Sequence, residues 1–192
     1  MKLFWEQGYN ATSLSALLGV MGIARSSFYA SFGDKRSLFI ECLELFAQRT
    51  LKHTQAETNV EAARRQPISL IHQFFETTVR DVPPTRLPYG CLLVNSVLEL
   101  ADTDDELAGI SASGLAQVES AFAQLLKWAR DSGEWKSALT PDEAARYLMT
   151  INQGVRVQCR KKVSRDEVWS GVENALSLVG IPISAPNVST TH

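Results

Sequence analysis

The spacing of the apolar residues constrains the fold of this 192-residue chain more than any other feature of its sequence. Apolar side chains recur three and four positions apart, which places them on one face of an α-helix. Long alternating β-branched runs and Asn-Gly hairpin signals, which are typical of strands, are missing. The sequence therefore predicts an all-α fold, in which Gly and Pro mark the ends of the helices.

Turn and cap residues divide the first quarter of the chain into short segments. Gly8, Gly22 and Gly33 follow apolar-periodic runs and are expected to end helices, while Asp34 is expected to cap the next one. The pattern predicts four helices here, over residues 1–7, 13–21, 25–31 and 34–53.

The rest of the chain follows the same rules. Residues 54–66 are polar and are predicted to form a connection. Two capping boxes, beginning at Thr140 and Ser164, place a Glu three residues after a hydroxyl and so predict two helix starts. The expected helices cover residues 68–82, 90–101, 104–131, 141–162 and 165–180, and a frayed tail follows.

Composition excludes several classes of protein. Hydrophobic residues make up 45% of the chain, which is enough for a buried core. Cys42, Cys91 and Cys159 are far apart, so neither a disulfide framework nor a zinc site is expected. No apolar run is long enough for a membrane span. The sequence offers no phosphate loop, catalytic triad or metal-ligand cluster. We therefore expect a soluble, cytoplasmic protein that is not an enzyme and holds no metal or cofactor.

One stretch, from Gly22 to Lys35, points to a function. A helix of about eight residues, a turn and a second short helix are typical of a helix-turn-helix, whose second helix enters the DNA major groove. Apolar side chains lock the two helices together, and Lys35 is placed for a phosphate. The alternative is a helical corner with an exposed polar face. The residues that the spacing points outward are Arg25, Ser26, Ser27, Tyr29 and Ser31.

A resemblance separates these alternatives. The run LFWEQGYNATSLSALLGVMGIARSSFYASFGDKRSLF, residues 3–39, resembles the DNA-binding region of the TetR family of transcriptional regulators. The resemblance implies that three side chains touch the DNA backbone and three face bases. The first three are Thr12, Tyr29 and Lys35, and the others are Arg25, Ser27 and Ser31.

Two departures from the family pattern bear on the DNA-binding region. Only Met1 and Lys2 precede the Leu-Phe pair, where family members carry a longer and often basic segment. The first helix is therefore expected to be short, which either weakens DNA binding or means that the natural start lies upstream. Ala24 stands where a Ser commonly caps the recognition helix.

The family resemblance also implies a domain plan. It predicts a helix-turn-helix domain over residues 1–46, a ligand-binding and dimerisation domain over 47–182, and a flexible tail over 183–192. The expected function is a ligand-responsive regulator, a repressor released from a palindromic double-stranded operator by a small apolar molecule and dimeric through its last two helices. The alternative is a helical small-molecule binding or sequestering protein with an impaired DNA-binding region.

The ligand site is less clearly marked. Aromatic side chains of the second domain are expected either to line an apolar cavity or to belong to the plain core. Polar groups in an apolar helix need partners when buried, which makes Asn95 and Glu99 candidate ligand contacts. Cys91 is either a redox-sensitive thiol or a small buried hydrophobe. The full set of predicted ligand-binding residues is Phe74, Phe75, Asn95, Glu99, Phe122 and Tyr147.

Overall fold

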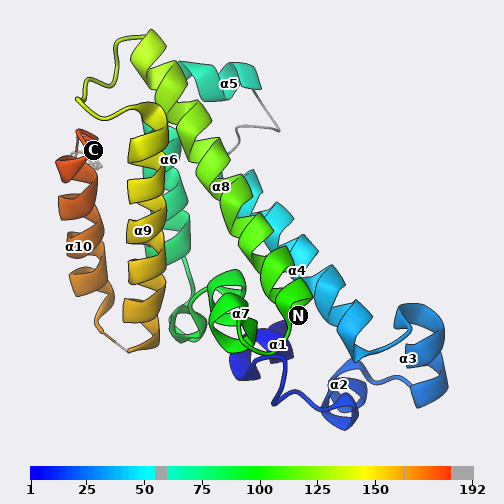
Figure 1. Cartoon of the computed structure of the whole chain (residues 1–192). Coiled ribbons are helices and arrows are strands. Elements are labelled where there is room, and N and C mark those ends of the chain that lie inside the picture. Colours follow the sequence, from blue (N-terminus) through cyan, green and yellow to red (C-terminus); the bar gives the residue numbers. More distant parts are fainter. Residues whose placement is uncertain (55–59, 162, 183–192) are drawn as a thin grey trace, which may run out of the picture.

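The computed structural model describes residues 1–54, 60–161 and 163–182, and these residues are folded into helices without a strand. The all-α prediction is confirmed. Figure 1 shows the order of the elements. The helices are α1 (Lys2–Gln7), α2 (Leu14–Met21), α3 (Arg25–Phe32), α4 (Lys35–Lys52), α5 (Val60–Arg65), α6 (Pro67–Phe75), a π-helix η1 (Glu76–Arg80), a 3₁₀-helix η2 (Leu87–Tyr89), α7 (Leu92–Leu100), α8 (Asp105–Asp131), α9 (Pro141–Arg160) and α10 (Arg165–Leu178).

The predicted caps lie where the sequence places them. The Asp34 carboxylate accepts a hydrogen bond from the Ser37 N–H at 2.7 Å, which begins α4. Thr140 and Ser164 both form complete capping boxes, at the starts of α9 and α10. Because each box satisfies two N–H groups that a helix start would leave without partners, both helices are fixed by local sequence.

Two segments differ from the prediction. The expected connection over residues 54–66 contains α5, which buries Ala63 against the core. The expected helix over 68–82 is regular only to Phe75 and then widens into the π-helix η1. π-Helical turns occur mostly where side chains insert into a helix or at functional sites, and apolar periodicity does not distinguish them from α-helix.

The longest helix, α8, lies at the centre of the packing and contacts α4, α6, α7 and α9 (Figure 1). Gly114 in α8 allows α4 and α7 to approach closely, because a Cβ built there would lie 3.0 Å from the Ala47 Cβ and 3.0 Å from the Leu93 Cδ1. Two apolar clusters flank α8. One joins α6, α8, α9 and α10, and the other joins α1–α4 to α7 and the start of α8.

The proposed division at residue 46 falls inside α4, which continues unbroken to Lys52. The division into domains therefore stays a prediction. The predicted tail over 183–192 lies outside the described residues.

Candidate functional site

Helices α2 and α3 lie at one end of the molecule, far from α9 and α10 (Figure 1). The Ser13 hydroxyl accepts from the Ala16 N–H at 3.1 Å and begins α2. Gly22 ends it in the left-handed region, with φ 66° and ψ 29°, a conformation that favours glycine. Phe28, with no exposed surface, then fixes α3 against the rest of this end. The chain thus has the helix, turn and helix that the spacing predicts.

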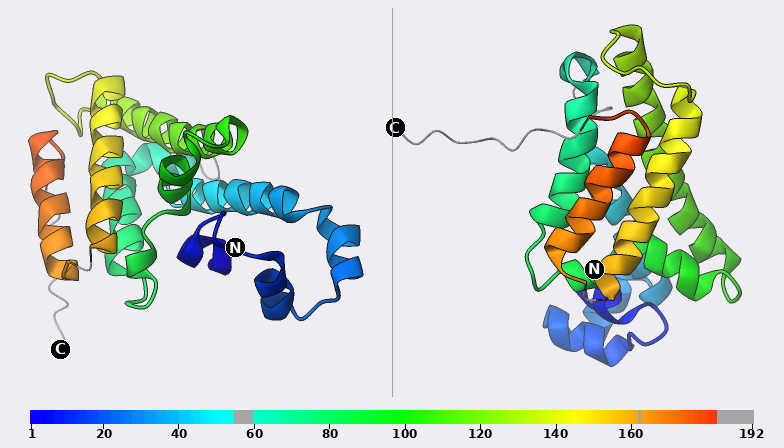
Figure 2. Two further views of the ribbon diagram at one scale, coloured as in Figure 1. Left: turned by 60° about the horizontal axis from the view of Figure 1, so that its bottom comes forward. Right: turned by 90° about the vertical axis from the view of Figure 1, so that its left-hand side faces the viewer.

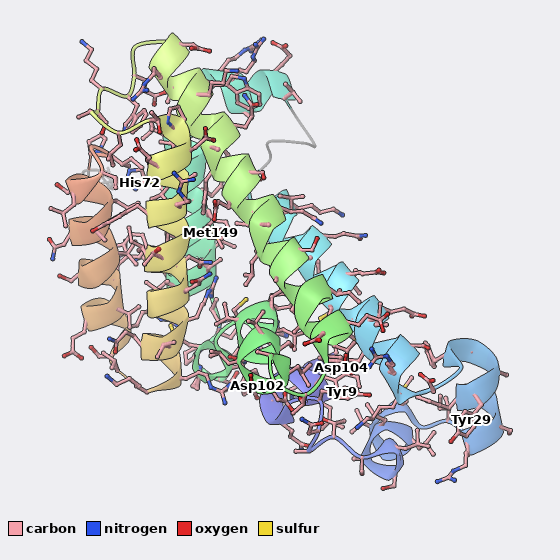
Figure 3. The ribbon with its side chains drawn as sticks, in the orientation of Figure 1. Tyr9, Tyr29, His72, Asp102, Asp104 and Met149 are labelled. Atoms are coloured by element: carbon pink, nitrogen blue, oxygen red, sulfur yellow. The ribbon has the colours of Figure 1, made fainter. Side chains whose placement is uncertain are left out.

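The outer face of α3 is exposed, and its outward side chains are not used in hydrogen bonds or ion pairs within the described residues. The five side chains predicted to point outward are all exposed, and Tyr29 retains 47% of its exposure (Figure 3). Across the described residues, none of the five makes a side-chain hydrogen bond or an ion pair. Short hydroxyls allow close approach to a groove, and a guanidinium matches a guanine edge or a phosphate. This set is Arg25, Ser26, Ser27, Tyr29 and Ser31.

Thr12 and Lys35 lie behind this face and are engaged within the chain. Thr12 has no exposed surface, and its hydroxyl donates to the Gly8 carbonyl at 2.6 Å. The Lys35 ammonium donates to the carbonyls of Tyr9 and Thr12 at 3.0 and 3.1 Å and lies 4.2 Å from the Tyr9 ring centroid. The Thr12 hydroxyl therefore holds the loop before α2, and its contact with the DNA backbone stays a prediction. Lys35 ties the loop before α2 to α4.

A joint connects this end to α7. The Glu99 carboxylate accepts from the backbone N–H groups of Tyr9 at 3.0 Å and Asn10 at 2.8 Å. It also lies against Gly8, whose missing side chain leaves room for it, because a Cβ there would lie 2.5 Å from the Glu99 Oε2. Glu99 therefore fixes the path of the chain between α1 and α2, and sequence reasoning found the residue but predicted a different role.

A second joint connects the start of α4 to the start of α8. The Arg36 guanidinium forms a bidentate ion pair with the Asp104 carboxylate and also donates to the Glu106 carboxylate at 2.6 Å. Arg36 holds the pKa of Asp104 down to about 2, helped by the Leu107 N–H that Asp104 caps. Figure 3 shows Asp104 close to Tyr9, so both joints lie on one side of the molecule.

The aromatic residues predicted to line a ligand cavity form a packed core cluster instead. Phe74, Phe75 and Phe122 have no exposed surface, and the rings of Phe74 and Phe122 meet edge to face at 4.9 Å. Tyr147 points outward and is 45% exposed. None of these four lines the described cavities of about 310, 230, 580 and 400 Å³. Their ligand-binding role stays a prediction.

Asn95 and Glu99 do line a cavity, of about 310 Å³, between α1 and α7. Both side chains already have partners, since Asn95 donates to the Tyr89 carbonyl at 2.8 Å and Glu99 holds the loop after α1. Cys91, which precedes α7, is buried.

A second cavity, of about 230 Å³, lies among α1, α4, η1, η2 and α9, and we name it the arginine cavity. Its walls include Trp5, Phe46 and the buried Arg156. Sequence reasoning missed this site. The available signal is that Arg156 falls on the same helical face as the buried residues Leu148, Asn152 and Val155, where an arginine needs a partner.

The outer faces of α9 and α10 lie side by side on the side of the molecule opposite α3 (Figure 2). The apolar side chains of Leu148, Val172 and Leu176 on these helices are buried within the chain. The outward positions are mostly polar, but two of them are glycines: Cβ atoms built at Gly154 and Gly171 would meet nothing within 4 Å. Tyr147, Val157 and Leu178 lie exposed on the same helices.

Comparison with known proteins identifies this architecture. The family model described as bacterial regulatory proteins, tetR family, matches residues 1–42. The chain is 30% identical over 180 residues to YezE, an uncharacterized HTH-type transcriptional regulator of Bacillus subtilis (strain 168), covering 93% of this chain and 91% of that protein. The chain belongs to the TetR family.

Other members of the TetR family agree with this assignment. The HTH-type transcriptional repressor ComR of Escherichia coli (strain K12) is 29% identical over 183 residues, which cover 93% of this chain and 84% of ComR. A TetR family regulator from Cytophaga hutchinsonii has the same fold, with a TM-score of 0.77 and 18% identity over 95% of this chain and 90% of its own.

Solved TetR family structures that contain DNA also match this chain. A cysteine mutant of the regulator CifR, complexed with 26-base-pair double-strand operator DNA, matches with a TM-score of 0.73 and 25% identity, covering 91% of this chain and 90% of that one.

Among residues 1–54, 60–161 and 163–182, no three His, Cys, Asp or Glu side chains are grouped to hold a metal ion. No helix in the same residues has the length and apolar character needed to cross a membrane.

Proposed function

We propose that this TetR family protein is a transcriptional repressor that places α3 in the major groove of a double-stranded operator and is released by a small molecule. The exposed outer face of α3 carries this proposal. Arg25, Ser27 and Ser31 read base edges, and Tyr29 contacts the backbone. The operator-bound CifR mutant and the repressor ComR support both the DNA partner and the sign of regulation.

The interface that joins two copies is the outer face of α9 and α10. A two-fold pair of helices would bury the exposed Tyr147, Val157 and Leu178, and the open space at Gly154 and Gly171 lets the backbones approach closely. Two α3 helices related by that two-fold axis match a palindromic operator. The function is one of binding and release, without catalysis.

Operator binding tests this function. The purified protein is titrated with its own promoter region and with random duplex, and log affinity is plotted against log salt. We expect a preference for the promoter and a steep fall with salt, because phosphate contacts release counterions. Arg25→Ala is expected to relax base preference, whereas Tyr29→Phe weakens all sequences alike. Equal affinity for promoter and random duplex would overturn the proposal.

Sedimentation tests the interface between copies. Gly154→Arg adds a side chain where the single chain has open space, and arginine favours a helix more than glycine does, so the variant is expected to fold. The added side chain would block the contact between the two copies, so the variant is expected to be monomeric. Gly109→Arg, at an equally open glycine of α8, is the matched control. A Gly154→Arg protein that stays dimeric at the same concentration as the control would move the interface elsewhere.

A further inference from the structure

The arginine cavity contains an excess of positive charge. Three arginines, Arg49, Arg86 and Arg156, line it, and none of the described lining residues carries a carboxylate. In the described part of the chain, none of the three forms an ion pair. A cavity lined by one sign of charge attracts ligands of the other sign.

Arg156 makes the strongest case, because it is only 8% exposed. Its guanidinium donates to the Thr78 carbonyl of η1 at 2.9 Å and to the Asn152 side-chain oxygen at 3.2 Å. Both acceptors are neutral, so the hydrogen bonds orient the guanidinium without neutralising it. Buried charges in proteins are normally paired, and an unpaired one costs free energy that a bound anion recovers.

A second polar group beside the cavity lacks a partner. The indole nitrogen of Trp5 is buried and makes no hydrogen bond, and Trp5 is part of the cavity wall. A buried N–H without an acceptor is destabilising, and a ligand oxygen at this position would satisfy it.

Two aromatic side chains form part of the wall. The Trp5 ring meets the Phe46 ring edge to face at 5.0 Å, and both residues line the cavity. His53 also lines the cavity; burial, with a smaller contribution from the Arg156 charge, lowers its pKa, so the ring is neutral at neutral pH. Planar apolar surface beside a fixed guanidinium matches a molecule with an aromatic ring and an acidic group.

We propose that the arginine cavity binds an aromatic carboxylate, whose oxygens accept from Arg156 and the Trp5 indole and whose ring lies against Phe46. This rests on the proposed function, because it names the chemical class of the releasing molecule. The proposed ligand carries a charge, unlike the apolar molecule expected from the sequence. Its site also differs from the expected one, which was lined by Phe74, Phe75 and Phe122. Since Trp5 belongs to α1, the ligand contacts the first helix of the DNA-binding end directly.

Calorimetric titration of the full chain with 2-naphthoate and with its uncharged isostere 2-naphthamide tests the charge requirement. We expect 2-naphthoate to bind at least about tenfold more tightly, the effect of one charge-assisted hydrogen-bond pair. Equal binding of the two, or binding of neither, would overturn the proposal. Inorganic phosphate that binds as tightly as 2-naphthoate would overturn its aromatic part.

Variants locate the site. Arg156→Gln is expected to reduce 2-naphthoate affinity about tenfold or more. Because this buried change also affects folding, Arg49→Gln with Arg86→Gln on the exposed rim provides a second test, with an expected loss of about two- to fivefold. Arg146→Gln, exposed and outside the cavity on α9, is the matched control. Unchanged affinity in both cavity variants would place binding elsewhere.

Operator binding in the presence of 2-naphthoate separates this inference from the proposed function. Promoter-specific binding together with no preference for 2-naphthoate over its amide would overturn the inference alone. Arg156-dependent 2-naphthoate binding in a protein that does not distinguish promoter from random duplex would support the cavity assignment and overturn the regulator.

Discussion

Helices α3 and α10 are both short surface helices, yet they are stabilised in opposite ways. Helix α10 begins with a complete capping box and buries Val168, Trp169, Val172 and Leu176. Helix α3 begins at Ala24 without a side-chain cap and buries Phe28 alone. Phe32 packs beside it, partly buried, and the outer face of the helix stays exposed. The difference teaches that α3 depends mainly on the tertiary contact of Phe28, whereas α10 is fixed by its own sequence and by several buried side chains.

The largest expected effect comes from removing that contact. Phe28→Ala should cost about 3–5 kcal/mol, because the side chain is fully buried. Hydrogen exchange should show the amides of α3 losing protection. Leu176→Ala is the matched change in α10, with an expected cost of about 2–5 kcal/mol. If α10 also lost protection selectively in Leu176→Ala, the contrast between the two helices would be wrong.

The joint at Glu99 should come next. Glu99→Ala removes two charge-assisted hydrogen bonds to the backbone of Tyr9 and Asn10 and should cost about 2 kcal/mol in urea unfolding. Glu106→Ala is a useful control, since its side chain is 68% exposed and its pair with Arg36 is a surface one, worth less than about 1 kcal/mol. Equal losses in both variants would show that Glu99 does not anchor the DNA-binding end.

Exchanging the caps sharpens the comparison directly. Ala24→Ser should stabilise the protein by about 1 kcal/mol, because it supplies the missing acceptor at the start of α3. Ser164→Ala should destabilise it by a similar amount, since it breaks the capping box of α10. Thermal unfolding should show a higher midpoint temperature for Ala24→Ser and a lower one for Ser164→Ala than for the wild type. A neutral Ala24→Ser would mean that tertiary contacts alone determine where α3 begins.

The smallest effect should be a dependence on acid. Asp104 has a pKa of about 2 in the folded chain against 3.8 for the ordinary group, through its pairing with Arg36. A lowered carboxyl pKa stabilises the fold above the ordinary value, and this contribution is lost as the pH falls from about 4 towards 2. Urea midpoints of wild type and Arg36→Gln should therefore converge in acid. A constant gap across this range would exclude the linkage.

The fold was predictable from sequence because its signals are local. Gly22 and Asp34 act within one turn of the helix that they end or begin, and both capping boxes lie within four residues. Segment α5 was missed because a run of six residues, three of them charged, carries little periodicity, and its one buried residue, Ala63, depends on distant helices.

The candidate site was only partly predictable. The outward direction of Arg25, Ser27 and Tyr29 follows from helical period once Phe28 is assigned to the interior. The hydrogen bonds of Thr12 and Lys35 to carbonyls within the chain were not predictable, because sequence does not reveal these partners. The DNA-backbone contacts expected of both residues stay predictions. The arginine cavity unites five elements far apart in sequence, so no local pattern indicates it.

Helix α4 reaches from the edge of the arginine cavity to the start of the DNA-binding end in one piece, 18 residues without a break. At 1.5 Å per residue it is a rod of roughly 27 Å. A rod without a hinge turns as a whole, so a tilt imposed near Phe46 and His53 displaces Lys35 at the opposite tip. In a two-fold assembly the two α4 helices would set the distance between the two α3 helices. The angle of α4 would thereby determine which operator spacing the dimer fits.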